Sequence, residues 1–264
     1  MGADERAAMS TSFDVSVFGL GGRVAAVTGA NTGLGRAIAE ALAGAGADLA
    51  LVGRSDPAET LAAIRALGRR ATWVEADLGA RPDYSAIVRK ISGELGGLHV
   101  LVNNAGIIRR ANAIDFTEAD WDAVLDVNLK SVFFLSQAAA RHMIANGGGK
   151  IINIASMLSF QGGIRVPSYT ASKSGIAGLT RLLANEWASQ GINVNAIAPG
   201  YFATNNTAAL QADAKRNAEI LGRIPAGRWG NPRDLGGASV FLASNASDYV
   251  QGIILPVDGG WLAR

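Results

Sequence analysis

Cysteine is absent from this sequence of 264 residues. Disulfide bonds and thiolate metal sites are therefore excluded, and a reducing compartment is permitted. An excess of charge of one sign is also missing, because the sequence has 24 Lys and Arg against 22 Asp and Glu. The cations form no run or stripe. Such a balance does not indicate a nucleic-acid-binding surface. His99 and His142 lie far apart without ligand-like spacing, so we expect no metal site.

Long apolar runs are missing as well. No stretch of about twenty apolar residues is present to span a bilayer. The first residues include early acidic side chains and lack the apolar segment of a signal peptide. We therefore expect a cytoplasmic protein without membrane contact. Residues 1–20 are expected to form a flexible leader, and 21–264 a single domain, because no linker or shift in composition divides them.

Short apolar runs alternate with helical patterns along the chain. Because the runs are apolar on both faces, they indicate a parallel sheet covered by helices on each side, and right-handed crossovers make it a doubly wound, Rossmann-like α/β domain. The expected strands are 23–29, 47–54, 70–78, 98–106, 149–156, 191–200 and 252–260, and the expected helices are 33–46, 57–68, 82–96, 117–146, 167–190, 204–222 and 231–244.

A glycine-rich loop, TGANTGLG (28–35), separates the first expected strand from the first helix. Gly29 permits a tight turn, while Gly33 and Gly35 let a pyrophosphate approach the backbone and the helix N-terminus. The spacing is G-x-x-x-G-x-G rather than the common G-x-G-x-x-G. The loop alone therefore leaves an ordinary strand-to-helix turn open as the alternative to a dinucleotide site.

The end of the second expected strand, LVGRSD, distinguishes NAD from NADP. A carboxylate there would bind a ribose 2′-hydroxyl, whereas an arginine would accept a 2′-phosphate. Gly53 leaves room and Arg54 offers a guanidinium, which favours NADP(H). Two alternatives stay open: Asp56 could serve a ribose, and Arg54 could be a solvated loop cation.

The segment IINIASMLSFQGGIRVPSYTASKSG (151–175) carries groups suited to proton transfer. Tyr169 and Lys173 lie at helical positions i and i+4, so both occupy one face. A neighbouring ammonium lowers the pKa of a tyrosine, which then becomes a usable acid or base. Ser156, at the end of the preceding strand, can donate a hydrogen bond to the same substrate oxygen. The set predicts polarisation of a carbonyl for hydride attack, or proton removal from an alcohol.

Three further signals follow expected strands or interrupt a helix: NNAG (103–106), Asn128 and PGYFAT (199–204). With TGxxxGxG and the Ser–Tyr–Lys set, the sequence resembles the short-chain dehydrogenase/reductases over residues 20–264. The resemblance implies Tyr169 as acid/base, Lys173 as the partner that lowers its pKa, Ser156 as the carbonyl-orienting residue and Asn128 as holder of a relay water. It implies an NAD(H) or NADP(H) site made of Gly29, Asn31, Thr32, Gly33, Leu34, Gly35, Arg54, Asp77, Leu78, Asn103, Ala105, Gly106, Tyr169, Lys173, Pro199, Gly200, Phe202 and Thr204.

Other stretches, among them NNAGIIRR, NVNAIAPGYFATNNT, RIPAGRWG and VDGGWLAR, are similar to the 2-deoxy-D-gluconate 3-dehydrogenases, also named 2-dehydro-3-deoxy-D-gluconate 5-dehydrogenases. That resemblance implies a deoxy-sugar acid as substrate, mostly NAD(H) as cofactor, and a homotetramer. A sugar acid needs a cation, best a forked guanidinium, and polar donors. Arg110 or Arg165 is the expected carboxylate anchor. The expected substrate contacts are Arg110, Ser156, Gln161, Arg165, Tyr169 and Asn205, with Arg109 and Asn206 as further candidates.

Other functions compete with this interpretation. A related reductase could act on a 3-oxoacyl thioester or a polyol, although the polar cluster near the expected cleft disfavours a greasy acyl chain. A non-catalytic cofactor-binding regulator is disfavoured by the intact catalytic set, and a Ser156 hydrolase by the absence of flanking glycines and of a suitably placed histidine. The tryptophans, including Trp229 and Trp261, are expected to pack rather than recognise a ligand, with Trp261 near a subunit contact.

Overall fold

The protein was analysed as a computed structural model that describes residues 14–264. Seven parallel strands form one sheet in the order β3-β2-β1-β4-β5-β6-β7. The order reverses direction between β1 and β4, and in open α/β sheets ligands bind outside the carboxyl ends of the strands at such a point. The strands are β1 (Val24–Thr28), β2 (Asp48–Gly53), β3 (Ala71–Glu75), β4 (Val100–Asn103), β5 (Gly149–Ile154), β6 (Ile192–Pro199) and β7 (Ile254–Val257).

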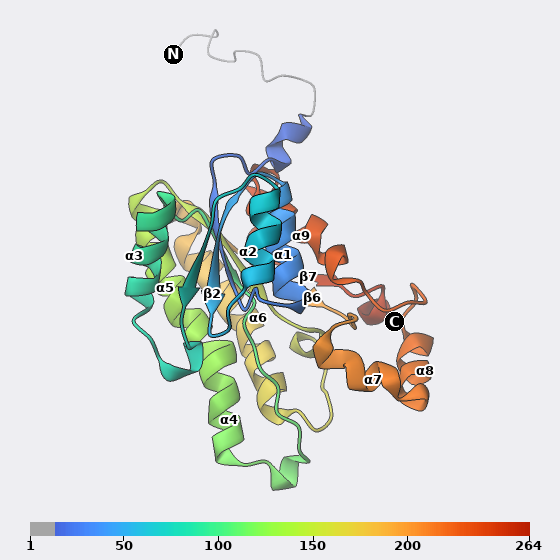
Figure 1. Cartoon of the computed structure of the whole chain (residues 1–264). Coiled ribbons are helices and arrows are strands. Elements are labelled where there is room, and N and C mark those ends of the chain that lie inside the picture. The colour runs from blue at the N-terminus through green and yellow to red at the C-terminus, as the bar shows by residue number, and fades with distance from the viewer. Residues whose placement is uncertain (1–13) are drawn as a thin grey trace, which may run out of the picture.

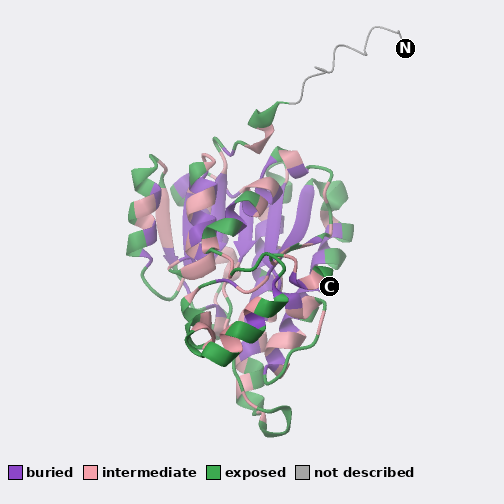
Figure 2. Ribbon diagram, turned by 90° about the vertical axis from the view of Figure 1, so that its right-hand side faces the viewer, coloured by how far each residue is buried: buried purple, intermediate pink, exposed green. Residues whose placement is uncertain are grey.

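Helices cover both faces of the sheet (Figure 1). One apolar core lies beneath α3, α5 and α6, and a second lies beneath α1, α2 and α9. The central strands are buried along their whole length, as Figure 2 shows, which explains their unbroken apolar sequences. The helices are α1 (Gly33–Gly44), α2 (Ala58–Ala66), α3 (Tyr84–Leu95), α4 (Glu118–Leu125), α5 (Ser131–Ala145), α6 (Pro167–Trp187), α7 (Ala208–Ala212), α8 (Ala214–Arg223) and α9 (Gly236–Ala243).

The doubly wound α/β fold is confirmed, but several boundaries differ from the sequence prediction. Of the predicted leader 1–20, residues 1–13 lie outside the described residues, whereas Val15–Phe18 forms a 3₁₀ turn and Leu20 is buried. The Leu20 N–H donates to the Ala45 carbonyl at 2.8 Å, and the Phe18 ring lies 6.4 Å from Phe241. Apolar contacts and a backbone hydrogen bond thus attach this segment to the domain.

Two predicted helices are interrupted. The expected helix 117–146 divides into α4 and α5 around a π-helical turn, Asp126–Lys130, which contains Asn128. The expected helix 204–222 divides into α7 and α8, because Asp213 adopts an extended backbone and caps α8 by accepting from the Arg216 N–H. The third strand ends at Glu75 rather than residue 78, and Asp77 caps the short turn Leu78–Ala80.

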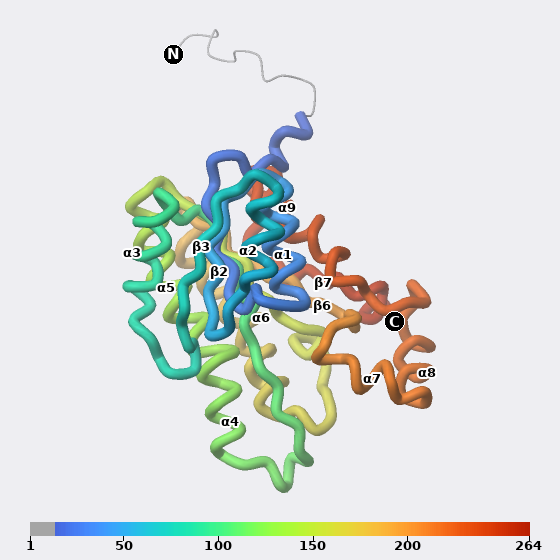
Figure 3. Tube along the Cα trace, viewed as in Figure 1, coloured from blue at the N-terminus to red at the C-terminus, as the bar shows by residue number. Residues whose placement is uncertain are grey.

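The chain end returns to α8. The C-terminal segment, red in Figure 3, lies beside the orange arm formed by α7 and α8. The Arg264 guanidinium donates to the Gly222 carbonyl at 2.6 Å, which joins the two segments directly. Within residues 14–264, no helix is long and apolar enough to cross a membrane.

Candidate active site

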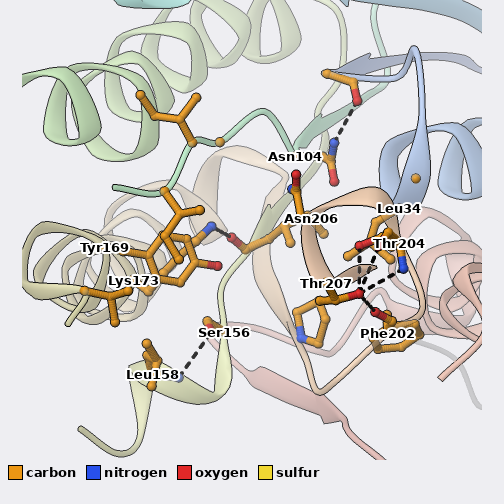
Figure 4. A pocket seen from close by; sticks show the side chains of 18 of the residues that line it. Leu34, Asn104, Ser156, Leu158, Tyr169, Lys173, Phe202, Thr204, Asn206 and Thr207 are labelled. Atoms are coloured by element: carbon orange, nitrogen blue, oxygen red, sulfur yellow. Dashed lines mark hydrogen bonds between the residues drawn. The ribbon is translucent and has the colours of Figure 1, made fainter. Parts of the chain in front are cut away.

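A cavity of about 1090 Å³ opens at the carboxyl ends of the strands. Its wall is built by the β1–α1 loop, by the segments after β2, β4, β5 and β6, and by residues of α6 and α8. Tyr169 and Lys173 project into it from α6, and Ser156 lies opposite them after β5 (Figure 4). Chain segments far apart in sequence therefore meet where the strand order reverses.

The β1–α1 loop fits a dinucleotide phosphate. Gly29 and Gly33 have positive φ angles of 65° and 56°, which a side chain rarely adopts. A Cβ on Gly35 would lie 2.3 Å from the Gly29 carbonyl oxygen, so only glycine permits this close packing. The Thr32 side chain does not cap α1, and the first-turn N–H groups therefore stay available for an anion.

The adenosine end of the cavity carries a charged pair. Arg54 follows β2, and its guanidinium lies 3.7 Å from a carboxylate oxygen of Asp77. The other oxygen of Asp77 accepts the Gly79 N–H at 2.9 Å, which holds the carboxylate at this position. Both side chains are exposed, so solvent screens their attraction. Arg54 is therefore available to a ribose phosphate, and both residues line the cavity, while their contacts to a cofactor stay predictions.

The first asparagine of the NNAG segment, Asn103, was predicted to contact the cofactor, but the structure places it elsewhere. Asn103 is buried and does not line the cavity; its amide donates to the Ser136 hydroxyl and to the Asn153 side chain, both at 2.9 Å. Asn104, which the sequence analysis did not select, lines the cavity and donates to the carbonyls of Thr28 and Gly29. Asn103 thus joins β4 to β5 and α5, because the last residue of β4 points into the interior.

The catalytic candidates surround one corner of the cavity. The Lys173 ammonium lies 5.6 Å from the centre of the Tyr169 ring and donates to the Ile154 carbonyl at 2.5 Å. The Ser156 hydroxyl oxygen accepts the Leu158 N–H at 3.2 Å, and its own proton is left for another acceptor. The carbonyl that ends β5 therefore positions the lysine beneath the tyrosine.

The acidity of Tyr169 departs from the sequence-based expectation. Burial raises the pKa of the Tyr169 phenol, while the Ser156 hydroxyl and the positive charge of Arg110 lower it. Desolvation of the phenolate outweighs these stabilising groups. The Lys173 ammonium, which lies beneath the ring rather than at the hydroxyl, does not offset this desolvation.

Lys173 is itself destabilised as a cation. Burial lowers its pKa to about 8 from an ordinary value of 10.5. The Ile154 carbonyl and the face of the Tyr169 ring compensate only in part for the lost hydration of the ammonium. The lysine is therefore close to titration at physiological pH, which suits a group that exchanges protons with its surroundings.

This burial predicts a pH-dependent stability difference for Lys173→Met. The pKa of Lys173 is lower in the folded protein (about 8) than in the unfolded chain (10.5), so its charge lowers the free energy of unfolding at pH values below about 8. This destabilisation disappears as the pH rises from 8 towards 10.5. We expect the variant to be more stable than the parent at pH 7 by about 1–3 kcal/mol, allowing for the unpaired carbonyl. Urea denaturation at pH 7 and pH 10 measures the difference. A difference that does not shrink at pH 10 would contradict it.

Asn128 lies behind the cavity wall. It is 1% exposed, its amide oxygen accepts the Ile107 N–H at 2.8 Å, and its amide nitrogen donates to the Ile107 carbonyl at 2.9 Å. The side chain therefore fixes the loop after β4 and is not free to bind substrate. The surrounding π turn is a local feature that often marks functional sites. Its implied part in a water relay stays a prediction.

The predicted substrate residues do reach the cavity, with different partners. Arg110 lies close enough to Tyr169 to affect its pKa, whereas Arg109 pairs with Asp120 at 3.2 Å. Arg165 occupies an exposed loop with a positive φ of 63°. The cavity wall includes Arg110, Gln161, Arg165, Asn205 and Asn206, together with the predicted cofactor residues except Asn103.

Several cavity residues were missed by the sequence analysis. Trp261 was assigned to packing, and it is indeed 4% exposed, yet it also lines the cavity. Tyr201 and three charged residues of α8, Arg216, Glu219 and Arg223, join it there. Motif reasoning could not select them, because they belong to no recognised motif and come from α8 and from the chain end. Among residues 14–264, no group of three or more His, Asp or Glu could hold a metal ion.

Together these features define a class of protein: an oxidoreductase that uses a nicotinamide dinucleotide. The sequence profile described as enoyl-(acyl carrier protein) reductase matches residues 29–262. The chain belongs to the short-chain dehydrogenase/reductase family.

Several individual proteins share much of their sequence and fold with this chain. The 2-dehydro-3-deoxy-D-gluconate 5-dehydrogenase of Escherichia coli K12 is 62% identical over 95% of this chain and 99% of its own. That of Dickeya dadantii is 60% identical over the same shares. An Agrobacterium tumefaciens structure provisionally named 2-deoxy-D-gluconate 3-dehydrogenase, with bound NADP, has a TM-score of 0.88 at 60% identity, covering 94% of this chain and 99% of its own. A gluconate 5-dehydrogenase from Burkholderia cenocepacia, with NADP and tartrate, has a TM-score of 0.90 at 41% identity, covering 94% and 98%.

Proposed function

We propose that the protein interconverts a hydroxyl and a keto group on a deoxy-sugar acid, 2-dehydro-3-deoxy-D-gluconate or 2-deoxy-D-gluconate, with NAD(H) or NADP(H). The observation that carries this proposal is the meeting of Ser156, Tyr169 and Lys173 in one cavity with a glycine-lined phosphate loop. The names of relatives at 60% identity and above support the substrate class.

The chain's own residues move the proton and orient the substrate. A bound nicotinamide supplies or accepts the hydride. Tyr169 removes the proton from the substrate hydroxyl during oxidation, or donates it to the oxygen during reduction. Ser156 donates a hydrogen bond to the same oxygen. The Lys173 charge, buried under the ring, favours the phenolate as the proton leaves.

The cofactor site suits both nicotinamide dinucleotides. Arg54 is the group that would bind the 2′-phosphate of NADP(H), and Asp77 is the candidate contact to the adenine. The relatives of the same fold with bound NADP support the arginine's role. When NAD(H) binds, Arg54 can stay paired with Asp77, since no phosphate then competes for the guanidinium.

The polar cavity favours a sugar acid over an acyl chain. Arg110, Gln161, Arg165 and Asn205 all line the same cavity as Tyr169. An acyl thioester would leave these groups without partners, and unpaired polar groups in a binding site reduce affinity.

A direct assay tests the proposed function. Purified protein is incubated with 2-dehydro-3-deoxy-D-gluconate and NAD⁺ or NADP⁺ in parallel, and reduced nicotinamide is followed by absorbance. We expect turnover with at least one cofactor; if it needs NADP⁺, Arg54→Ala should abolish the preference. Reduction of a 3-oxoacyl thioester with no turnover of any sugar acid would contradict the proposal.

We also propose a homotetramer, as the family resemblance implies. Support comes from an uncovered apolar surface on α4 and α5 that includes Trp121 and Phe134, 38% and 40% exposed. Exposed aromatic rings of this size are common at subunit contacts. Location in the cytoplasm stays a prediction from the sequence.

A further inference from the structure

A guanidinium stacks on an indole at one end of the cavity. Arg223 belongs to the last turn of α8, and its Cζ lies 3.9 Å from the centre of the Trp261 ring. Both residues line the cavity, and Figure 3 shows the chain end beside α8. A planar cation over an aromatic face keeps its hydrogen-bonding edge free for a ligand.

The indole in this pair is fixed from several sides. Trp261 is 4% exposed and packs with Met157, Ile220 and Ile224 in one apolar cluster. Its Nε1 donates to the Gln161 side-chain oxygen at 3.4 Å. Met157 belongs to the same cluster as Trp261 and directly follows Ser156. The indole is therefore linked through Met157 to the segment that carries the predicted catalytic serine.

The charge of Arg223 is uncompensated among residues 14–264. Its helix neighbour Arg216 pairs with Glu219 at 2.9 Å, and Arg54 faces Asp77. By contrast, the guanidinium of Arg223 has no ion pair or hydrogen bond in the described part of the chain. An unpaired cation held in a cavity attracts an anionic group of the ligand.

The chemistry of the substrate requires a cation away from Tyr169. In a six-carbon 2-keto acid oxidised at carbon 5, the carboxylate lies four carbon–carbon bonds from the reacting carbon, about 5 Å in an extended chain. Among the described residues, neither Arg110 nor Arg165 stacks on an aromatic ring as Arg223 does. Arg165 also lies on an exposed loop.

We propose that Arg223, stacked on Trp261, binds the carboxylate of the substrate and selects sugar acids over neutral polyols and acyl thioesters. This inference rests on the proposed function and names the residue that recognises the carboxylate of the substrate. It differs from the sequence prediction, which placed the anchor at Arg110 or Arg165. The fork of the guanidinium matches both carboxylate oxygens, which a lysine cannot do.

Steady-state kinetics of Arg223→Met against Lys215→Met test this assignment. Lys215 lies in the same helix, but it is exposed and does not line the cavity. We expect Arg223→Met to raise KM for the sugar acid about 10–100-fold, with kcat changed less than about 3-fold, and Lys215→Met to leave both nearly unchanged. Activity on a neutral hexitol should not fall. Arg223→Lys should recover part of the KM, and Trp261→Leu should raise KM a few fold.

Direct binding separates failure of this inference from failure of the proposed function. D-gluconate is titrated into the protein without turnover, and its binding is followed by tryptophan fluorescence. Affinity lost in Arg223→Met but kept in Lys215→Met supports the assignment even if no sugar acid is oxidised. Unchanged gluconate affinity in a folded Arg223→Met protein would overturn it, and a loss confined to Arg110→Met would move the anchor to Arg110.

Discussion

Tyr169→Phe is expected to lower kcat by at least about 10³-fold while the affinity for NAD(P)H changes less than about 3-fold. The substitution removes only the hydroxyl, which is the group that exchanges the proton with the substrate oxygen. The ring stays over Lys173, whose ammonium lies 5.6 Å from its centre, so the cavity wall is preserved. Stopped assays measure turnover, and nicotinamide fluorescence measures binding.

Tyr249→Phe is the matched control for this prediction. Tyr249 is fully exposed and does not line the cavity, so the loss of its hydroxyl should leave kcat unchanged. Turnover of Tyr169→Phe within 10-fold of the parent would assign the proton transfer to another group. A large loss of cofactor affinity in this variant would indicate a positioning role for the hydroxyl instead.

Gly35→Ala is expected to weaken cofactor binding about 10–100-fold and to lower the thermal midpoint. The added Cβ would lie 2.3 Å from the carbonyl oxygen of Gly29 in the phosphate loop and 2.4 Å from the amide nitrogen of Asn104, which follows β4 and donates to that loop. Relieving such overlap displaces backbone and costs about 1–3 kcal/mol. Calorimetric titration with NADP⁺ and a melting curve measure the two effects.

Gly44→Ala in the same helix is the control. No heavy atom lies within 4 Å of a Cβ at Gly44, so alanine should stabilise α1 by up to about 1 kcal/mol through helix propensity. Cofactor affinity should be unchanged there. Equal affinity of the Gly35→Ala and parent proteins would show that the phosphate loop can shift without losing its ligand.

Apolar strands and local motifs were the parts that the sequence alone determined. An unbroken apolar run that ends at a glycine, as in RVAAVTG, predicts a parallel strand that is buried on both faces. Helices cover both faces of such a strand, so it needs no polar side. The residues of the phosphate loop, and the four-residue spacing of Tyr169 and Lys173, are local, so they could be recognised before folding. The residues that these elements carry line one cavity in the structure, while their roles in the reaction stay predictions.

Only the tertiary structure decided which side chains face the cavity and what surrounds them. Asn103 and Asn104 are neighbours in sequence, yet only Asn104 lines the cavity. The raised pKa of Tyr169 depends on desolvation by residues from several elements. The Arg223–Trp261 pair joins α8 to the chain end. The two residues are far apart in sequence, so no helical or strand spacing predicts their contact. Local patterns determine strands, helices and loops, whereas burial, protonation and long-range contacts depend on how the finished elements pack.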